Sequence, residues 1–135
     1  MAFTVNCDMG EGFGLYSFGI DFELMPYITH ANIACGFHAS DPPLMWKTVK
    51  EAVKYNLKIG AHPGFPDREG FGRRRMHFTR NEITSLILYQ SGALNAFLEA
   101  EGRKLDYLKP HGALMGMAQE DDEVAKGIAD AAEIL

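Results

Sequence analysis

Four short apolar segments, each followed by a loop rich in glycine or proline, constrain the fold of this chain more than any other feature of its sequence. They span residues 3–8, 28–35, 57–62 and 105–109, and helix-forming segments alternate with them. Strands that alternate with helices pair in parallel, because each helix carries the chain back across a face of the sheet. The pattern predicts a parallel (βα)n fold of the α/β class with about four units, arranged as half of a barrel or as an open sheet.

Local signals mark the starts of the main helices. Asp41 precedes two prolines in the manner of an N-cap, so a helix is expected to begin near Pro42. Thr79 and Glu82 have the spacing of a capping box ahead of a long amphipathic segment. A last helix is expected between about residues 119 and 135, behind an acidic first turn.

Composition limits the partners of the chain. With 135 residues, 47% of them hydrophobic, the chain can bury one core, so we expect a single domain over residues 1–135. The formal net charge of -5 argues against nucleic acid or an anionic membrane and favours a small molecule or a protein. No segment reaches the ~20 apolar residues of a membrane span, and the N-terminus lacks the pattern of a signal peptide. We therefore expect a cytoplasmic protein with reduced thiols at Cys7 and Cys35.

Ionisable side chains gather directly after the predicted strands. They are Asp8 and Glu11 after the first strand, His38 and Asp41 after the second, His62 and Asp67 after the third, and Lys109 and His111 after the fourth. Because the carboxyl ends of parallel strands open on one face, these groups should meet at one rim. Asp41 is explained by its capping role, and Asp67 lies in a candidate binding loop. The others are our candidate catalytic residues.

Each of these residues alone also has a structural explanation. Asp8 could bond to the backbone of the glycine-rich turn that follows it. A single histidine after a strand is more often a hydrogen-bonding residue than a catalyst. Three imidazoles at successive strand ends nevertheless favour a shared site. His30, at a strand start, and His77, in a basic stretch, are expected to be structural.

The loop from residue 64 to residue 74 is a candidate for substrate binding. It places Asp67, Arg68, Arg73 and Arg74 among glycines, and guanidinium groups can hold a carboxylate or a phosphate. An ordinary solvated loop would have the same composition. Prolines next to His62 and Lys109 stiffen the backbone there and leave room for a cis peptide bond.

Four blocks of sequence together resemble a known family. They are residues 6–11 (NCDMGE), 31–38 (ANIACGFH), 60–67 (GAHPGFPD) and 109–114 (KPHGAL). On these blocks the chain resembles the LamB/YcsF family, the A subunit of bacterial ATP-dependent 5-oxoprolinase. Family members are roughly twice as long, so the resemblance covers their N-terminal half. Asn32, inside the second block, joins the expected substrate-binding residues.

The resemblance implies a barrel-like α/β fold related to glycoside hydrolases and polysaccharide deacetylases. It also implies ring opening of 5-oxo-L-proline to L-glutamate, coupled to ATP hydrolysis and performed with partner subunits B and C. The sequence contains no Gly-x-x-x-x-Gly-Lys-Ser/Thr phosphate loop, so ATP is expected to bind elsewhere or on another subunit. Because the chain matches only half of the family's length, its activity alone stays open.

Opening a lactam requires a nucleophile, stabilisation of the oxyanion and a proton for the departing nitrogen. The expected roles are general base for Asp8 or Glu11, proton donor for His62 and His111, oxyanion stabiliser for Lys109, and clamp on the substrate carboxylate for Arg73 or Arg74.

Two other functions stay open. A metal-dependent amidohydrolase or deacetylase would use Asp8, His62 and His111 as metal ligands, although no HxxxH or HExxH spacing supports such a site. A non-catalytic half-domain or binding module would need none of these groups. Self-association of the chain also stays open.

Overall fold

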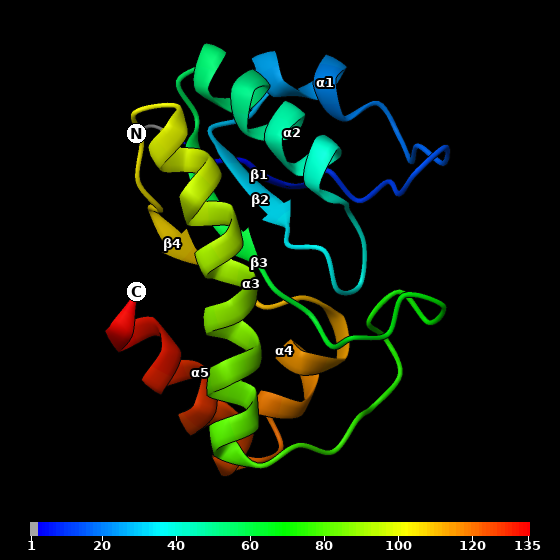
Figure 1. Ribbon diagram of the computed structural model, residues 1–135, viewed down its shortest axis with the longest axis vertical. Coiled ribbons are helices and arrows are strands. Elements are labelled where there is room, and N and C mark those ends of the chain that lie inside the picture. Colours follow the sequence, from blue (N-terminus) through cyan, green and yellow to red (C-terminus); the bar gives the residue numbers. More distant parts are fainter. Residues whose placement is uncertain (1–2) are drawn as a thin grey trace.

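The computed structural model describes residues 3–135, which contain one open sheet of four parallel strands (Figure 1). The strands are β1 (Asn6–Met9), β2 (His30–Ala34), β3 (Lys58–His62) and β4 (Tyr107–Leu108), in the order β1-β2-β3-β4. Every neighbouring pair is parallel. This arrangement confirms the α/β class and the open-sheet alternative, and it is consistent with part of a (βα)n barrel.

Helices alternate with these strands along the chain. They are α1 (Asp21–Leu24), the 3-10 helix η1 (Met25–Tyr27), α2 (Pro42–Lys54), α3 (Arg80–Ala100), α4 (Gly112–Ala118) and α5 (Asp122–Ile134). The start of α2 is confirmed at Pro42, because the Asp41 carboxylate accepts a hydrogen bond from the Leu44 amide at 2.9 Å. The capping box of Thr79 and Glu82 at the start of α3 is also confirmed.

Two parts of the strand–helix alternation differ from the prediction. The first unit lacks a full helix, because residues 10–19 form a glycine-rich loop and only the short α1 and η1 follow it. The prediction also missed α4. This helix has only seven residues, two of them glycines, and it begins two residues after Pro110, so its sequence resembles that of a loop. Throughout the described residues the peptide bonds are trans, so the cis bond considered beside His62 or Lys109 is absent.

The two faces of the sheet differ in chemistry. Alternate strand residues such as Ile33 and Ile59 are fully buried against the apolar sides of α2 and α3, which cover this face (Figure 1). The opposite face carries polar side chains from every strand. They are Asn6 and Asp8 on β1, His30 and Asn32 on β2, His62 on β3, and Tyr107 with Lys109 on and after β4. The sheet therefore has one helix-covered face and one polar face.

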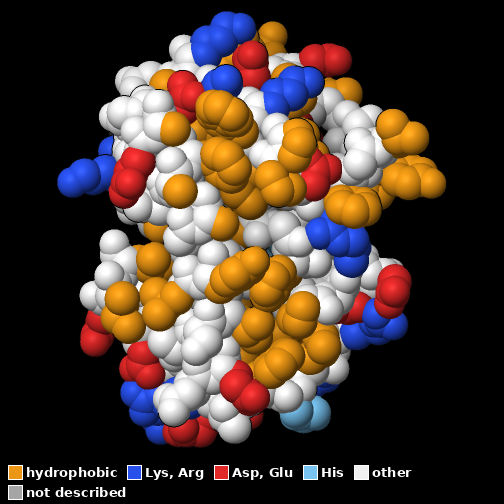
Figure 2. All heavy atoms as spheres, viewed as in Figure 1, with side chains coloured by type: hydrophobic (Ala, Val, Ile, Leu, Met, Phe, Trp, Pro, Cys, Tyr) orange, Lys and Arg blue, Asp and Glu red, His pale blue; other side chains and the backbone are white. Residues whose placement is uncertain are grey.

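Beyond the sheet, a second apolar core lies between α3, α4 and α5, around Phe65, Ile87 and Leu114. Hydrophobic side chains also gather on the outer surface over α2 and α3 (Figure 2), where Trp46 and Tyr89 are exposed. None of the helices in residues 3–135 has the length and apolar character required to cross a membrane.

Candidate functional site

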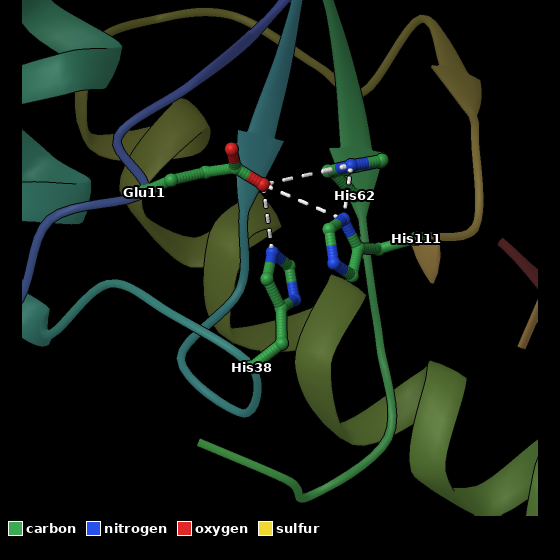
Figure 3. A group of neighbouring side chains, drawn as sticks. All are labelled: Glu11, His38, His62 and His111. Atoms are coloured by element: carbon green, nitrogen blue, oxygen red, sulfur yellow. Dashed lines mark hydrogen bonds and ion pairs between the residues drawn. The ribbon is translucent and has the colours of Figure 1, made fainter. Parts of the chain in front are cut away.

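Four residues predicted for the site converge at the carboxyl ends of the strands (Figure 3). The Glu11 Oε1 atom lies 3.0 Å from His38 Nε2, 3.4 Å from His111 Nδ1 and 3.9 Å from His62 Nε2. The three imidazoles are almost fully buried, whereas the Glu11 side chain is 18% exposed. We call these four residues the histidine–glutamate cluster. They come from three strand-end loops and the last residue of β3, as the sequence predicted.

The loop after β3 presses its backbone against the cluster. Gly72 has a φ of +64°, and a β-carbon there would lie 2.8 Å from His38 Cβ and 2.9 Å from His111 Cδ2. Only glycine fits this close approach. The ring of the neighbouring Phe71 meets the rings of His38 and His111 edge-on, with centroids 5.5 and 5.0 Å away. This loop therefore shields two of the imidazoles from solvent.

Two backbone carbonyls fix the hydrogen positions on the imidazoles. His62 Nδ1 lies 2.6 Å from the Lys109 carbonyl oxygen, and His111 Nε2 lies 2.7 Å from the Phe71 carbonyl oxygen. A carbonyl only accepts, so each of these ring nitrogens carries the hydrogen and donates. In the neutral rings, His62 Nε2 and His111 Nδ1 then carry lone pairs, although these two atoms are 3.0 Å apart. Two lone pairs at this distance repel each other, and a proton or a cation between them would remove the repulsion.

Burial controls the charge of two imidazoles. It lowers the pKa of His111 to about 4, with help from the neighbouring His38. Burial also lowers the pKa of His38, although the hydrogen bond to Glu11 opposes this effect. Both rings are therefore neutral near pH 7.

Asp8 occupies the next position on the polar face. Its Oδ1 atom accepts hydrogen bonds from Lys109 Nζ at 2.5 Å and Asn32 Nδ2 at 2.7 Å, and its Oδ2 atom lies 3.4 Å from His62 Nε2. Burial raises the pKa of this carboxyl, but the close contact with the His62 ring and the hydrogen bonds from Lys109 and Asn32 outweigh burial and hold it well below its usual range. Asp8 is therefore ionised and fixed in place.

Asn32 positions Asp8 through hydrogen bonds inside the protein. Its side chain is fully buried and also donates to Asn6 Oδ1 at 2.8 Å. Its own Oδ1 atom accepts from the Tyr107 hydroxyl at 2.6 Å. Every polar atom of the side chain thus has a partner inside the protein, which explains Asn32 without a substrate contact.

In the candidate binding loop, Asp67 and Arg74, both predicted to contact substrate, bind each other. The Asp67 side chain is 2% exposed and accepts hydrogen bonds from Arg74 Nε at 2.7 Å and from the Gly70 amide at 3.0 Å. The Arg74 guanidinium lowers the pKa of this carboxyl. Arg73 is exposed and forms no ion pair with any residue in the described part of the chain. Of the two candidate arginines, Arg73 is therefore the one available to a ligand.

Tyr107 was not among the predicted site residues, and Arg68 was predicted only as a member of the binding loop. Tyr107 precedes Lys109 by two residues, and this spacing places both on the same face of a strand, which is a signal that could have identified it. Arg68 donates to the carbonyl oxygens of Gly36 and Ser40 and stacks its guanidinium 3.8 Å above the Phe13 ring. It joins the loops after β1, β2 and β3.

Open pockets adjoin the site on two sides. One, of about 470 Å³, is lined by Glu11 and His38 together with Phe13, Phe71 and Arg68. The other, of about 410 Å³, lies over the polar face of the sheet and is lined by residues that include Asn32, Tyr107 and Lys109. A small polar molecule can therefore reach the site without a change of fold.

Parallel strands with ionisable groups at their carboxyl ends define the class of this protein as a (βα)n-type α/β domain with a strand-end site. The LamB/YcsF family model matches residues 3–135. The chain belongs to the LamB/YcsF family.

Similar proteins agree with this assignment. The chain is 53% identical over 127 residues to the A subunit of 5-oxoprolinase from Bacillus cereus (strain AH820), covering 94% of this chain and 50% of that protein. It is 52% identical over 127 residues to the protein of the same name from Bacillus mycoides (strain KBAB4), with the same coverage of 94% and 50%. The crystal structure of the lactam utilization protein from Thermus thermophilus superposes with a TM-score of 0.96 at 46% identity, covering 99% of this chain and 54% of that one. The chain spans about half the length of these relatives.

Proposed function

We propose that this chain provides the lactam site of an ATP-dependent 5-oxoprolinase, which opens 5-oxo-L-proline to L-glutamate. The names of the relatives, which refer to 5-oxoprolinase and to lactam utilization, support this substrate. The observation that carries the proposal is the ionised Asp8, held between Lys109 and His62 beside the histidine–glutamate cluster. Such a site can bind both ends of a polar amide bond and a water molecule.

Asp8 and Lys109 are assigned to the reacting amide. The Lys109 ammonium can donate to the carbonyl oxygen as negative charge develops there. Asp8 accepts a hydrogen bond from the attacking water and orients it, since its low pKa makes it a weak base. This assignment favours Asp8 over Glu11 as the group that handles water, because Glu11 Oε1 is within 3.0 Å of the buried His38.

The facing lone pairs of His62 and His111 can hold a proton or a cation between the two rings. The outer N–H groups of His62 and His111 are committed to backbone carbonyls, so neither neutral ring can donate inward. A proton or a cation between them would assist departure of the lactam nitrogen or polarise the amide. The role of simple proton donor, expected for both residues from the sequence, is therefore replaced by a shared charge.

Arg73 is assigned as the clamp on the substrate carboxylate. Arg74 already binds Asp67 and Glu69, whereas Arg73 extends from the same loop with its guanidinium 5.7 Å from the Phe71 ring that covers the cluster. A guanidinium fits a carboxylate through two parallel hydrogen bonds. The clamp therefore lies at the edge of the site.

ATP and the other subunits complete the proposal. Phosphorylation of the amide oxygen would turn a poor electrophile into a good one before water attacks. We assign ATP binding to the partner subunits B and C or to a shared surface, since the chain has no phosphate loop of the Gly-x-x-x-x-Gly-Lys-Ser/Thr type.

Reconstitution tests this function. The protein is combined with subunits B and C, and glutamate formation from 5-oxo-L-proline is measured with and without ATP. Asp8→Asn should lower kcat/KM by about 100-fold or more, because the variant removes the charge that orients water. The exposed Asp122→Asn, at the start of α5, is the matched control and should be unchanged. Full turnover by Asp8→Asn, or turnover at the same rate without ATP, would contradict the proposal.

A further inference from the structure

We propose that Glu11, His62 and His111 bind one divalent transition-metal ion, and that His38 orients Glu11 as a positioning residue. This proposal stands on the geometry of the cluster and does not depend on the proposed function. It replaces the metal set considered from the sequence, because Glu11 takes the place of Asp8, whose Oδ1 atom is bound by Lys109.

Lone pairs of two imidazoles and one carboxylate converge in the cluster. His62 Nε2 and His111 Nδ1 face each other at 3.0 Å, and each is the non-donating nitrogen of its ring because the other nitrogen donates to a carbonyl. Glu11 Oε1, also an acceptor, lies 3.4 Å from His111 Nδ1. Three acceptor atoms converging in a buried place repel one another unless a cation lies between them.

The space between the three ligand atoms matches the size of a metal ion. The three pairs of ligand atoms are separated by 3.0, 3.4 and 3.9 Å. With metal–ligand distances of about 2.1 Å, these separations give angles of about 90°, 110° and 135° at the ion. The angles describe a pyramid with the three protein ligands on one side. An ion therefore fits with a position left open, as in metal sites that also bind water or substrate.

Backbone carbonyls behind the two histidine ligands orient their rings. Metal-binding histidines usually donate their other ring N–H to a backbone carbonyl or a carboxylate, which fixes the ring and its tautomer. His62 does this with the Lys109 carbonyl and His111 with the Phe71 carbonyl. Both rings are therefore held with the ligating nitrogen turned inward before any ion binds.

His38 has a different place in the cluster. Its ring is stacked on the His111 ring, with centroids 3.7 Å apart and an angle of 3° between the planes. An ion in the plane of one ring cannot lie in the plane of the other, so the two rings cannot both be good ligands. His38 Nε2 instead lies 3.0 Å from Glu11 Oε1, where it can donate and hold the carboxylate toward the ion.

The ligand chemistry selects the class of ion. Two imidazoles and one carboxylate suit zinc, cobalt, iron or nickel better than magnesium or calcium, which prefer oxygen ligands. The nearby Asp8 carboxylate adds a second negative charge, 3.4 Å from His62 Nε2. We therefore expect a divalent transition metal, with cobalt as a convenient spectroscopic probe.

Cobalt titration of the chelator-treated protein tests the site. Visible absorption and calorimetry should report one equivalent of Co²⁺ with imidazole ligands. His62→Asn, His111→Asn and Glu11→Gln should each weaken binding about 100-fold or more, since each removes a ligand. His38→Gln should keep one equivalent but bind about 10- to 100-fold more weakly. The exposed His77→Asn is the matched control and should bind like the unchanged protein.

Several outcomes would overturn the metal site. One is that the folded protein binds no cobalt. Another is that cobalt binding is unchanged by the three ligand substitutions. If a variant fails to fold, X-ray absorption of the cobalt-loaded, unsubstituted protein still tests the site. Two imidazole ligands on the cobalt are expected, and a spectrum without imidazole ligands would refute the site. Metal binding without oxoprolinase turnover would keep this inference and remove the proposed function.

Discussion

The ring of Tyr107 lies directly against the backbone of Gly60, its register partner on β3, where a β-carbon would overlap the ring. The absence of a side chain at residue 60 lets the ring cross β3 and reach β2. There the hydroxyl donates to Asn32, which in turn donates to Asp8. A glycine without any functional group thus fixes the position of the carboxylate in the proposed lactam site.

Substitution of Gly60 by alanine tests this relationship. The new methyl group must displace the Tyr107 ring, so Gly60→Ala should lower the free energy of unfolding by about 1–3 kcal/mol. Tyr107→Phe keeps the ring and loses only the hydrogen bond to Asn32, at a cost of about 1 kcal/mol. Urea denaturation followed by circular dichroism measures both.

Gly92→Ala is the control for the added methyl group. Gly92 lies inside α3 with open space around its α-carbon, so alanine should stabilise the protein by about 0.5–1 kcal/mol. If Gly60→Ala were as harmless as Gly92→Ala, the packing of Tyr107 across β3 would not hold in solution.

Acid should weaken the link between β3 and the segment before β4. Partial burial raises the pKa of Asp106, but hydrogen bonds from the Lys58 ammonium and the Ile59 amide outweigh it and lower the pKa overall. A carboxyl with a lowered pKa in the folded state adds stability above its unfolded pKa of about 3.9 and loses it as the pH falls below that value.

The measurement is the free energy of unfolding between about pH 7 and pH 3 for the unchanged protein and Asp106→Asn. The unchanged protein should be the more stable at neutral pH, and the difference should shrink as the pH falls below about 4. A difference that stays constant over this range would show that ionised Asp106 contributes nothing.

The two free cysteines should differ in reactivity. Burial raises the pKa of the Cys35 thiol to about 12, so almost no thiolate forms near pH 8. Cys7 is only partly buried, and burial together with the nearby Asp8 raises its pKa as well. In the native protein a disulfide reagent should modify Cys7 slowly and Cys35 only on unfolding. Mass spectrometry of digested, labelled protein identifies the thiol, and rapid labelling of Cys35 in the native state would refute its burial.

The sequence predicted what depends on local signals and on the geometry of parallel sheets. The cap at Asp41 and the box at Thr79 involve residues three positions apart, so their patterns are visible in the chain. The meeting of Glu11 with the three histidines follows from strand order, because parallel strands end at one edge.

What the sequence could not predict depends on register and on backbone atoms. Tyr107 bonds to Asn32 across two strands, so the internal role of Asn32 is visible only once the register is known. The tautomers of His62 and His111 are set by carbonyl groups, which every residue has. The short α4 lacked a long enough pattern to distinguish it from a loop.

Arg73 and Arg74 offer the most direct test of the proposed clamp, because adjacent arginines have different partners. Arg73→Gln should raise the KM for 5-oxo-L-proline by about 10- to 100-fold with little effect on stability, since it removes a charged hydrogen bond to the substrate carboxylate. Arg74→Gln should lower the urea midpoint, because buried Asp67 loses its partner, while KM changes little. Steady-state kinetics of the reconstituted enzyme and urea titration of each variant separate the two effects. A KM raised by Arg74→Gln alone, with Arg73→Gln unchanged, would reverse the assignment, and equal effects on KM and midpoint in both variants would leave the loop with a purely structural role.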